Sequence, residues 1–124
     1  MEALYKEIHQ KKEIVVIDYS MVSQGHLLDL MKHSLEVICS YEKSSALVLE
    51  IMTGVRLSKE ILDYFPTYYK KIKSHVWRWS SVGFGNLIFT EMVHSKQIDP
   101  HAINRQHIEW FETKEEAIEF LIGK

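Results

Sequence analysis

The order of apolar and polar residues along the chain predicts strands that alternate with helices. Four short runs rich in β-branched and aromatic residues are typical of strands in a covered sheet, and they span residues 13–19, 46–52, 75–82 and 107–111. Between them, apolar residues recur three and four positions apart, which predicts helices that follow Ser23, Ser58, residues 83–86 and Thr113. Such alternation is typical of an α/β fold with a mainly parallel sheet and right-handed crossovers.

Local features refine these predictions. Thr113 opens a T-x-x-E capping box, which marks the start of the last helix. Pro66 lies inside the helical stripe that precedes the third strand, so we expect a kink or a break there. Residues 3–8 are expected to add an edge strand or to lie across the sheet, and residues 97–106 are predicted to form a loop.

The composition favours one globular domain over residues 1–124. The chain has 46% hydrophobic and 26% charged residues, and it is long enough to close a core without disulfides. Its net charge of −2 does not favour binding to nucleic acid. The lone Cys39 cannot form an intrachain disulfide, and no apolar run reaches the roughly 18 residues of a membrane span. We therefore expect a cytoplasmic protein without stable membrane anchoring.

Ser58 stands at the start of the second helix, in the stretch T-G-V-R-L-S-K-E. As an N-cap it would accept a hydrogen bond from a backbone N–H of the first turn, a contribution of about 1 kcal/mol. Leu57 and Leu62 are placed to form a hydrophobic staple around it. A catalytic serine is not expected, because the sequence has neither a G-x-S-x-G motif nor a nearby histidine that could act as base.

Polar residues gather where the first two long strands end. Asp18 ends the first of them, and Thr53, Arg56 and Ser58 follow the second. The carboxyl ends of parallel strands meet at one edge of a sheet, which is where ligands of open α/β sheets tend to bind. We therefore predict a polar cluster at this edge. Glu50, inside the second of these strands, is expected at an exposed strand end or paired with Arg56 or Lys59, because an isolated buried carboxylate is costly.

The run from residue 75 to residue 82 predicts a strand with two different faces. By strict alternation, His75, Trp77, Trp79 and Ser81 share one face, and Val76, Arg78, Ser80 and Val82 share the other. Packing of Trp77 and Trp79 in a core is the favoured interpretation. If helices leave that face open, the two tryptophans would instead lie in a dimer interface or border a pocket for an apolar ligand.

No metal or cofactor site is predicted. The seven histidines form none of the H-x-H, H-x3-H or H-E-x-x-H patterns, and a single cysteine excludes a thiolate zinc site. The G-F-G stretch at residues 83–85 offers backbone N–H groups at a predicted helix start, a weak signal for an anion site. Close packing of a strand against the following helix explains these glycines better.

Several of these segments together resemble the STAS family. They are V-V-I-D-Y-S and L-V-L-E-I-M-T-G-V, each ahead of a helix, the G-F-G turn, and the closing F-E-T-K-E-E-A-I-E-F-L. The resemblance covers roughly residues 12–121 and is strongest to the stand-alone bacterial SpoIIAA-like members, whose fold is shared with CRAL-TRIO lipid-transfer domains. It implies a β/α superhelix of about four parallel strands in sequential order, with the crossover helices on one face and an optional N-terminal edge strand.

The resemblance also implies a function without catalysis. It suggests a regulatory module that binds a protein partner; the alternative is a small carrier or sensor of an apolar ligand such as a fatty acid. The serine that anti-sigma-factor antagonists of the family carry as phosphoacceptor falls nearest Ser58 here. Leu57 stands where the family has an aspartate, and Lys59 stands where it has serine or glycine. Both the capping and the phosphoacceptor interpretations of Ser58 stay open from sequence, and so does a homodimer.

Overall fold

The computed structural model describes residues 3–56, 58–83 and 108–123. The helix predicted after residues 83–86 and the loop predicted at 97–106 lie outside the described residues. Within the described residues, two short 3-10 turns occur, η1 (Tyr19–Met21) and η2 (Gln24–His26). The strands are β1 (Leu4–His9), β2 (Lys12–Asp18), β3 (Ala46–Ile51), β4 (Val76–Val82) and β5 (Ile108–Phe111). The helices are α1 (Leu27–Cys39), α2 (Lys59–Ile72) and α4 (Lys114–Leu121).

The strands form one sheet in the sequential order β1-β2-β3-β4-β5. β1 runs antiparallel to β2, and each of the other neighbouring pairs is parallel. The predicted α/β fold with about four parallel strands in sequential order is therefore confirmed, and so is the extra N-terminal edge strand. The turn from β1 to β2 has two residues, Gln10 and Lys11, both with positive φ (51° and 67°), as a type I′ hairpin turn requires.

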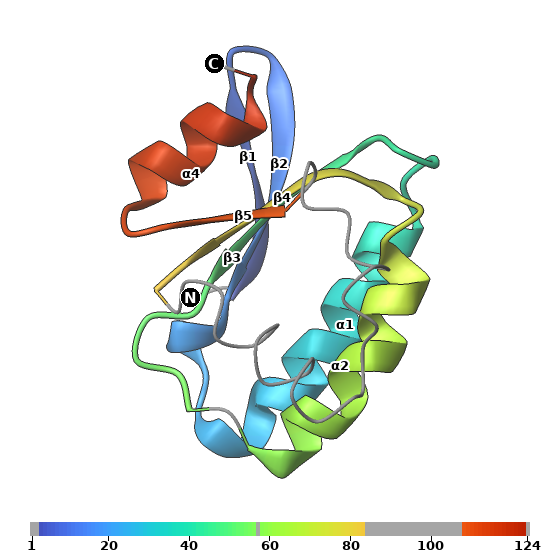
Figure 1. Ribbon diagram of the computed structural model, residues 1–124, viewed down its shortest axis with the longest axis vertical. Coiled ribbons are helices and arrows are strands. Elements are labelled where there is room, and N and C mark those ends of the chain that lie inside the picture. Colours follow the sequence, from blue (N-terminus) through green and yellow to red (C-terminus); the bar gives the residue numbers. More distant parts are fainter. Residues whose placement is uncertain (1–2, 57, 84–107, 124) are drawn as a thin grey trace.

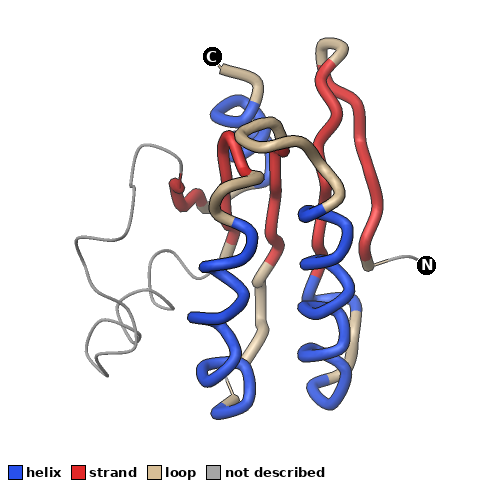
Figure 2. Tube along the Cα trace, turned by 90° about the vertical axis from the view of Figure 1, so that its right-hand side faces the viewer, coloured by secondary structure: helices blue, strands red, loops and turns tan. Residues whose placement is uncertain are grey.

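Helices cover both faces of the sheet. α1 and α2 lie side by side on one face, and α4 lies on the other (Figures 1 and 2). In β2, Val15 and Ile17 pack toward α1 and α2, whereas Ile14 and Val16 pack toward α4. This two-sided cover explains why β2 reads as a continuous apolar run instead of an alternating one.

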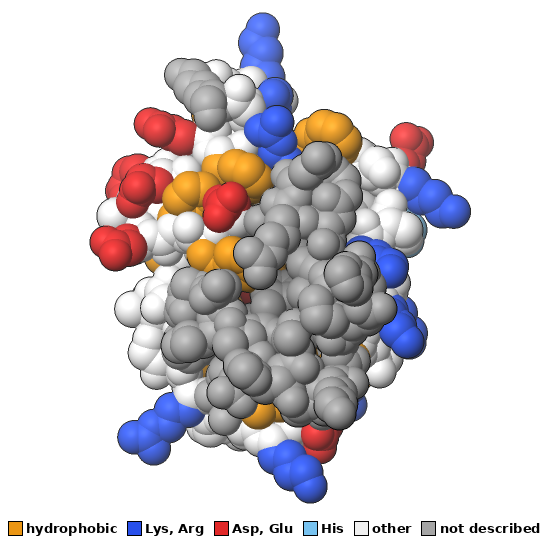
Figure 3. Space-filling view, viewed as in Figure 1, with side chains coloured by type: hydrophobic (Ala, Val, Ile, Leu, Met, Phe, Trp, Pro, Cys, Tyr) orange, Lys and Arg blue, Asp and Glu red, His pale blue; other side chains and the backbone are white. Residues whose placement is uncertain are grey.

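The surface over α4 is acidic. Figure 3 shows Asp and Glu side chains gathered on the side of the molecule where α4 lies. Glu115 and Glu116 occupy the first turn of α4, where negative charge complements the helix dipole. Thr113 caps this helix by accepting a hydrogen bond from the Glu116 N–H at 3.2 Å, as the capping box predicts.

α2 does not break at Pro66. The helix runs from Lys59 to Ile72 with the proline inside it, so of the predicted kink or break, the break is wrong. Proline removes one intrahelical hydrogen bond and crowds the preceding turn, at a cost of roughly 3 kcal/mol. Residues on both sides of it, Phe65 and Tyr69, are buried against the sheet. Burial of these aromatic side chains offsets the cost, because each removes a large apolar area from water.

A β-bulge at the start of β4 separates the two tryptophans that strict alternation places together. Ala46 pairs with Val76 but the next residue, Leu47, pairs with Arg78, so Trp77 is the extra residue of the bulge. As a result Val76 and Trp79 both belong to the core beneath α1 and α2, whereas Trp77 is 46% exposed. The prediction that Trp77 and Trp79 share one face is therefore wrong. The predicted packing in a core is confirmed for Trp79 but not for Trp77.

Across residues 3–56, 58–83 and 108–123, every helix is too short or too polar to cross a bilayer.

Candidate functional site

Ser58 is the N-cap of α2, as its position in the sequence predicts. Its backbone is extended (φ −89°, ψ 163°), and its side-chain oxygen accepts a hydrogen bond from the Ile61 N–H at 3.3 Å. Its carbonyl accepts the first intrahelical hydrogen bond, from the Leu62 N–H at 3.0 Å. The other half of the predicted staple, Leu57, lies outside the described residues. The geometry explains why a helix starts at Ser58, and this explanation requires no catalytic role for the serine.

Replacement of Ser58 by alanine should lower the free energy of unfolding by about 1 kcal/mol, because the Ile61 N–H then loses its partner. Replacement by aspartate should restore most of the loss, since aspartate is an equally good cap and its charge suits a helix N-terminus. Urea unfolding of the three proteins measures both effects. Equal stability of the alanine variant and the parent would contradict the capping role.

A polar hollow of about 380 Å³ opens at the carboxyl edge of the sheet. Thr53 and Arg56 from the corner after β3 line it, opposite Ser20 and Gln24 from the turns after β2. The Gln24 side-chain amide donates a hydrogen bond to the Arg56 carbonyl oxygen at 2.9 Å, which ties the two segments together. The hollow presents hydroxyl, amide and guanidinium groups, so it suits a polar or anionic ligand or a polar segment of a partner.

The structure brings together only part of the predicted polar cluster. Thr53 and Arg56 line the hollow, but Asp18 and Ser58 do not. The Asp18 carboxylate accepts hydrogen bonds from the backbone N–H and the hydroxyl of Ser20, so it caps η1. Ser20 and Gln24 are the members that sequence reasoning missed. Their position after the end of β2 is the signal that could have identified them.

Gly83 explains how two strand ends come close at this edge. A Cβ atom at Gly83 would lie 2.7 Å from the Thr53 backbone nitrogen, and its φ of +110° is unfavourable for other residues. Glycine therefore allows the end of β4 to pack against the corner that carries Thr53. The predicted packing of this strand end against the following helix stays a prediction, because that helix lies outside the described residues; the close packing observed at Gly83 is against the corner after β3. Gly85 lies outside the described residues.

Glu50 is buried in the core beneath α1 and α2, with 6% of its surface exposed. The Ser81 hydroxyl donates a hydrogen bond to its Oε2 atom at 3.3 Å. Burial raises the pKa of Glu50 to about 8, and the hydrogen bond from Ser81 acts in the opposite direction. The expected position at an exposed strand end, or in a pair with Arg56 or Lys59, is therefore wrong. At neutral pH the carboxyl group is mostly protonated.

Other buried polar side chains lie in the same layer. The hydroxyl oxygens of Ser34 and Tyr68 are 3.0 Å apart, and Ser34 also donates to the Met31 carbonyl oxygen at 2.8 Å. Burial raises the pKa of the Tyr19 and Tyr68 hydroxyls well above the usual value, and the nearby Glu50 carboxyl adds to the shift. The two tyrosine hydroxyls therefore stay neutral across the physiological range.

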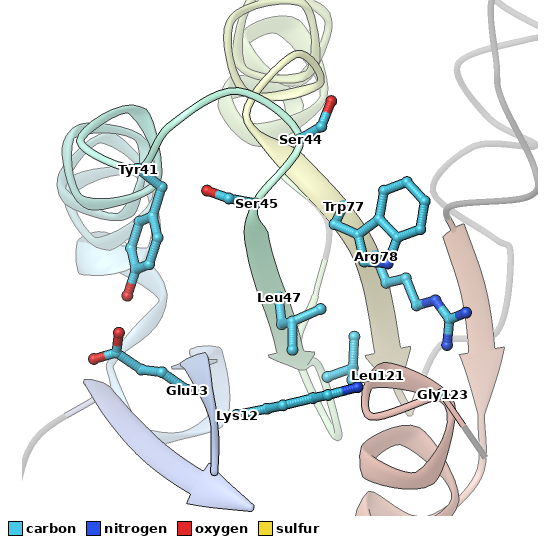
Figure 4. A pocket seen from close by; sticks show the side chains of 10 residues that line it. All are labelled: Lys12, Glu13, Tyr41, Ser44, Ser45, Leu47, Trp77, Arg78, Leu121 and Gly123. Atoms are coloured by element: carbon cyan, nitrogen blue, oxygen red, sulfur yellow. The ribbon is translucent and has the colours of Figure 1, made fainter.

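Trp79 and Trp77 have different surroundings. Trp79 is 2% exposed, and its ring centroid lies 6.0–6.2 Å from those of Phe65, Tyr68 and Tyr69. Trp77 instead lines a second hollow, formed at the amino ends of β2, β3 and β4 (Figure 4). An apolar ligand or a dimer partner could therefore contact Trp77, but Trp79 is inaccessible to either.

Metal binding has no candidate among the described residues. Within residues 3–56, 58–83 and 108–123, no three His, Cys, Asp or Glu side chains come close enough to hold an ion.

Comparisons with protein-family models, with curated proteins and with solved structures find no match for this chain. The STAS-like assignment therefore stays a prediction from sequence. The mixed α/β architecture, in contrast, is observed directly.

Proposed function

We propose that the chain is a non-enzymatic, cytoplasmic, STAS-like module that acts by binding a protein partner. The observation that carries this proposal is the corner from Thr53 to Arg56, which lines a polar hollow at the edge of a well-packed core. Thr53 and Arg56 are exposed on this corner, and the Gln24 contact holds it in place. An edge with exposed polar groups is suited to recognition of a polar segment on another protein.

The filled core favours this proposal over the carrier of an apolar ligand. The layer between the sheet and α1 and α2 contains the fully buried side chains of Phe65, Tyr68 and Trp79. The enclosed space beside Glu50 in this layer measures about 10 Å³. Small-molecule sites are typically about 300–1,000 Å³, so this space is far too small for a fatty acid.

A photo-crosslinking amino acid at position 56 tests the partner. We expect cells that express this variant to yield one dominant protein adduct after irradiation. The control places the same amino acid at Lys70, which is exposed near the far end of α2. The same adducts from both positions, or none from position 56, would argue against a partner at this edge.

The carrier alternative has a separate test. Native mass spectrometry of freshly purified protein should show the mass of the chain without a bound lipid, and it reports a homodimer in the same spectrum. A lipid that co-purifies at a constant ratio would replace the partner-binding proposal by the carrier.

The phosphoacceptor role of Ser58 belongs to the same proposal and depends on the family resemblance. Incubation with a kinase-like anti-sigma factor and ATP, followed by peptide mass mapping, measures it, with Ser58→Ala as the control. The Ser58 side chain already accepts a hydrogen bond from Ile61, and a phosphate there would face the helix N-terminus, which favours negative charge. Absence of phosphate on Ser58 would leave it as a cap alone.

A further inference from the structure

The second hollow lies at the amino ends of β2, β3 and β4, far along the strands from the corner that carries Thr53. It has a volume of about 630 Å³, within the usual range of small-molecule sites. Figure 4 shows side chains from the start of three strands, from the loop ahead of β3 and from the end of α4 around the same space. Because its lining residues differ from those of the carboxyl-edge hollow, a ligand here would be independent of the proposed partner site.

The hollow has an aromatic wall and an apolar floor. The β-bulge turns Trp77 out of the regular alternation of β4, so that its indole borders the hollow and stays 46% exposed. Leu47 and Leu121 lie beside it, one from the sheet and one from α4 (Figure 4). Bulges often re-aim a side chain next to a functional site. A flat apolar group of a ligand could pack against the indole face.

Two cations converge at one end of this apolar surface. The Lys12 Nζ atom donates to the Ile122 carbonyl oxygen at 2.9 Å, and the Arg78 Nη1 atom donates to the Phe120 carbonyl oxygen at 2.7 Å. Both atoms come within 4 Å of the place that a Cβ atom on Gly123 would take, at 3.8 Å and 3.4 Å. Each of these two contacts uses one N–H of its side chain. Lysine has three N–H donors and arginine has five, so both side chains have further donors to offer a ligand.

In the described part of the chain, the charged side chains that line the hollow are Lys12, Arg78 and Glu13, two positive and one negative. Their net charge of +1 favours an anion with a single charge. Among the described residues that line the hollow, Glu13 is the one with a carboxylate side chain, and it pairs with Lys6 at 3.6 Å. Figure 4 places Glu13 on the side of Tyr41, whereas Lys12 and Arg78 extend toward Leu121 and Gly123. The positive end of the hollow is therefore separate from the negative one, and it lies next to the apolar floor.

We propose that this hollow binds a small aromatic monocarboxylate, with its ring against the Trp77 indole and its carboxylate between Lys12 and Arg78. Ring packing and charge-assisted hydrogen bonds from the two cations then act on opposite ends of the same molecule. The indole alone would not distinguish such a ligand from a neutral aromatic compound. The two cations alone would not distinguish it from a small anion.

Titration of the full 15N-labelled chain with 2-naphthoate tests this site. We expect the Trp77 indole N–H and the amides of Leu47 and Arg78 to shift, with a dissociation constant in the millimolar range or below. The neutral analogue 2-naphthylmethanol has almost the same shape and should bind at least about fivefold more weakly, because it cannot accept charge-assisted hydrogen bonds. Added sodium chloride should weaken binding of the carboxylate only.

Three variants assign the contacts. Trp77→Ala should weaken both compounds by about tenfold, and Lys12→Gln should reduce the preference for the carboxylate over the alcohol, because Arg78 is then the remaining cation of the pair. Lys11→Gln, next to Lys12 in sequence but outside the lining of the hollow, should change neither. Thermal unfolding verifies that each variant is folded, and the comparison of the two compounds on the parent protein needs no variant. No shift at about 5 mM naphthoate, shifts confined to other residues, or equal affinity for the alcohol would overturn the proposal.

Discussion

The free energy of unfolding of the parent protein should fall by several kcal/mol between pH 4.5 and pH 8, and Glu50→Gln should remove most of that fall. The folded protein holds Glu50 in the core, where burial raises its pKa from 4.5 to about 8. One unit of pKa shift corresponds to about 1.4 kcal/mol, so the full effect of this group is on the order of 5 kcal/mol.

The direction follows from the protons that each state binds. Below pH 4.5 the Glu50 carboxyl is protonated in both the folded and the unfolded chain, so it contributes no dependence on pH. Between pH 4.5 and about 8 the unfolded chain releases this proton and the folded chain keeps it, so a rise in pH favours unfolding. Above about pH 8 both states are ionised, and the penalty stays constant. Glutamine cannot ionise and therefore lacks this dependence.

Urea unfolding at pH 5 and pH 8 measures the effect as a difference between two pH values. The difference is independent of any packing change that glutamine introduces at both pH values. Glu36→Gln is the matched control, because Glu36 is exposed on α1, and it should behave as the parent protein does. The same fall in the Glu50→Gln variant as in the parent would show that Glu50 is ionised in the folded state.

Trp79→Ala should destabilise the protein by about 3–5 kcal/mol, whereas Trp77→Ala should cost about 1 kcal/mol or less. Trp79 is fully covered, and its ring packs between Phe65, Tyr68 and Tyr69, so truncation leaves a cavity in the centre of the core. Trp77, two residues earlier on the same strand, is 46% exposed at the bulge. The pair therefore compares the same substitution on a buried and an exposed site.

Chemical unfolding of both variants, with the parent as reference, measures this difference. Near-ultraviolet circular dichroism should also change strongly for Trp79→Ala, because the removed ring lies in a fixed aromatic cluster. Equal losses of stability for the two variants would contradict the separation of the tryptophans by the bulge. They would support the regular alternation that the sequence alone predicts.

The architecture was predictable because each part of it depends on short-range patterns. The runs at residues 13–19 and 46–52 are apolar at successive positions, and this requires cover on both faces of the sheet. Ser58 and Thr113 are helix caps because an extended residue with a side-chain oxygen can satisfy N–H groups two or three positions ahead. Crossover connections between parallel strands are almost always right-handed, so α1 and α2 had to lie on one face.

The candidate site was predictable in part. Thr53 and Arg56 follow a predicted strand, and the carboxyl ends of parallel strands meet at one edge, so their common location follows from topology. Asp18 satisfies the same rule, but its side chain caps η1, because the Ser20 N–H and hydroxyl lie within its reach. A pattern of residue types does not show which local hydrogen bond a side chain will prefer.

The sequence by itself therefore determined the four parallel strands, the helices α1, α2 and α4, their order and the edge at which polar residues collect. Only the tertiary structure decided the burial of Glu50, the separation of Trp77 from Trp79, and the convergence of Lys12 and Arg78 on the end of α4. The physical reason is that these features join residues distant in the chain. One extra residue in β4 reverses the direction of a side chain, and the partner of a buried carboxyl comes from a neighbouring strand. Periodicity along the chain contains no information about either.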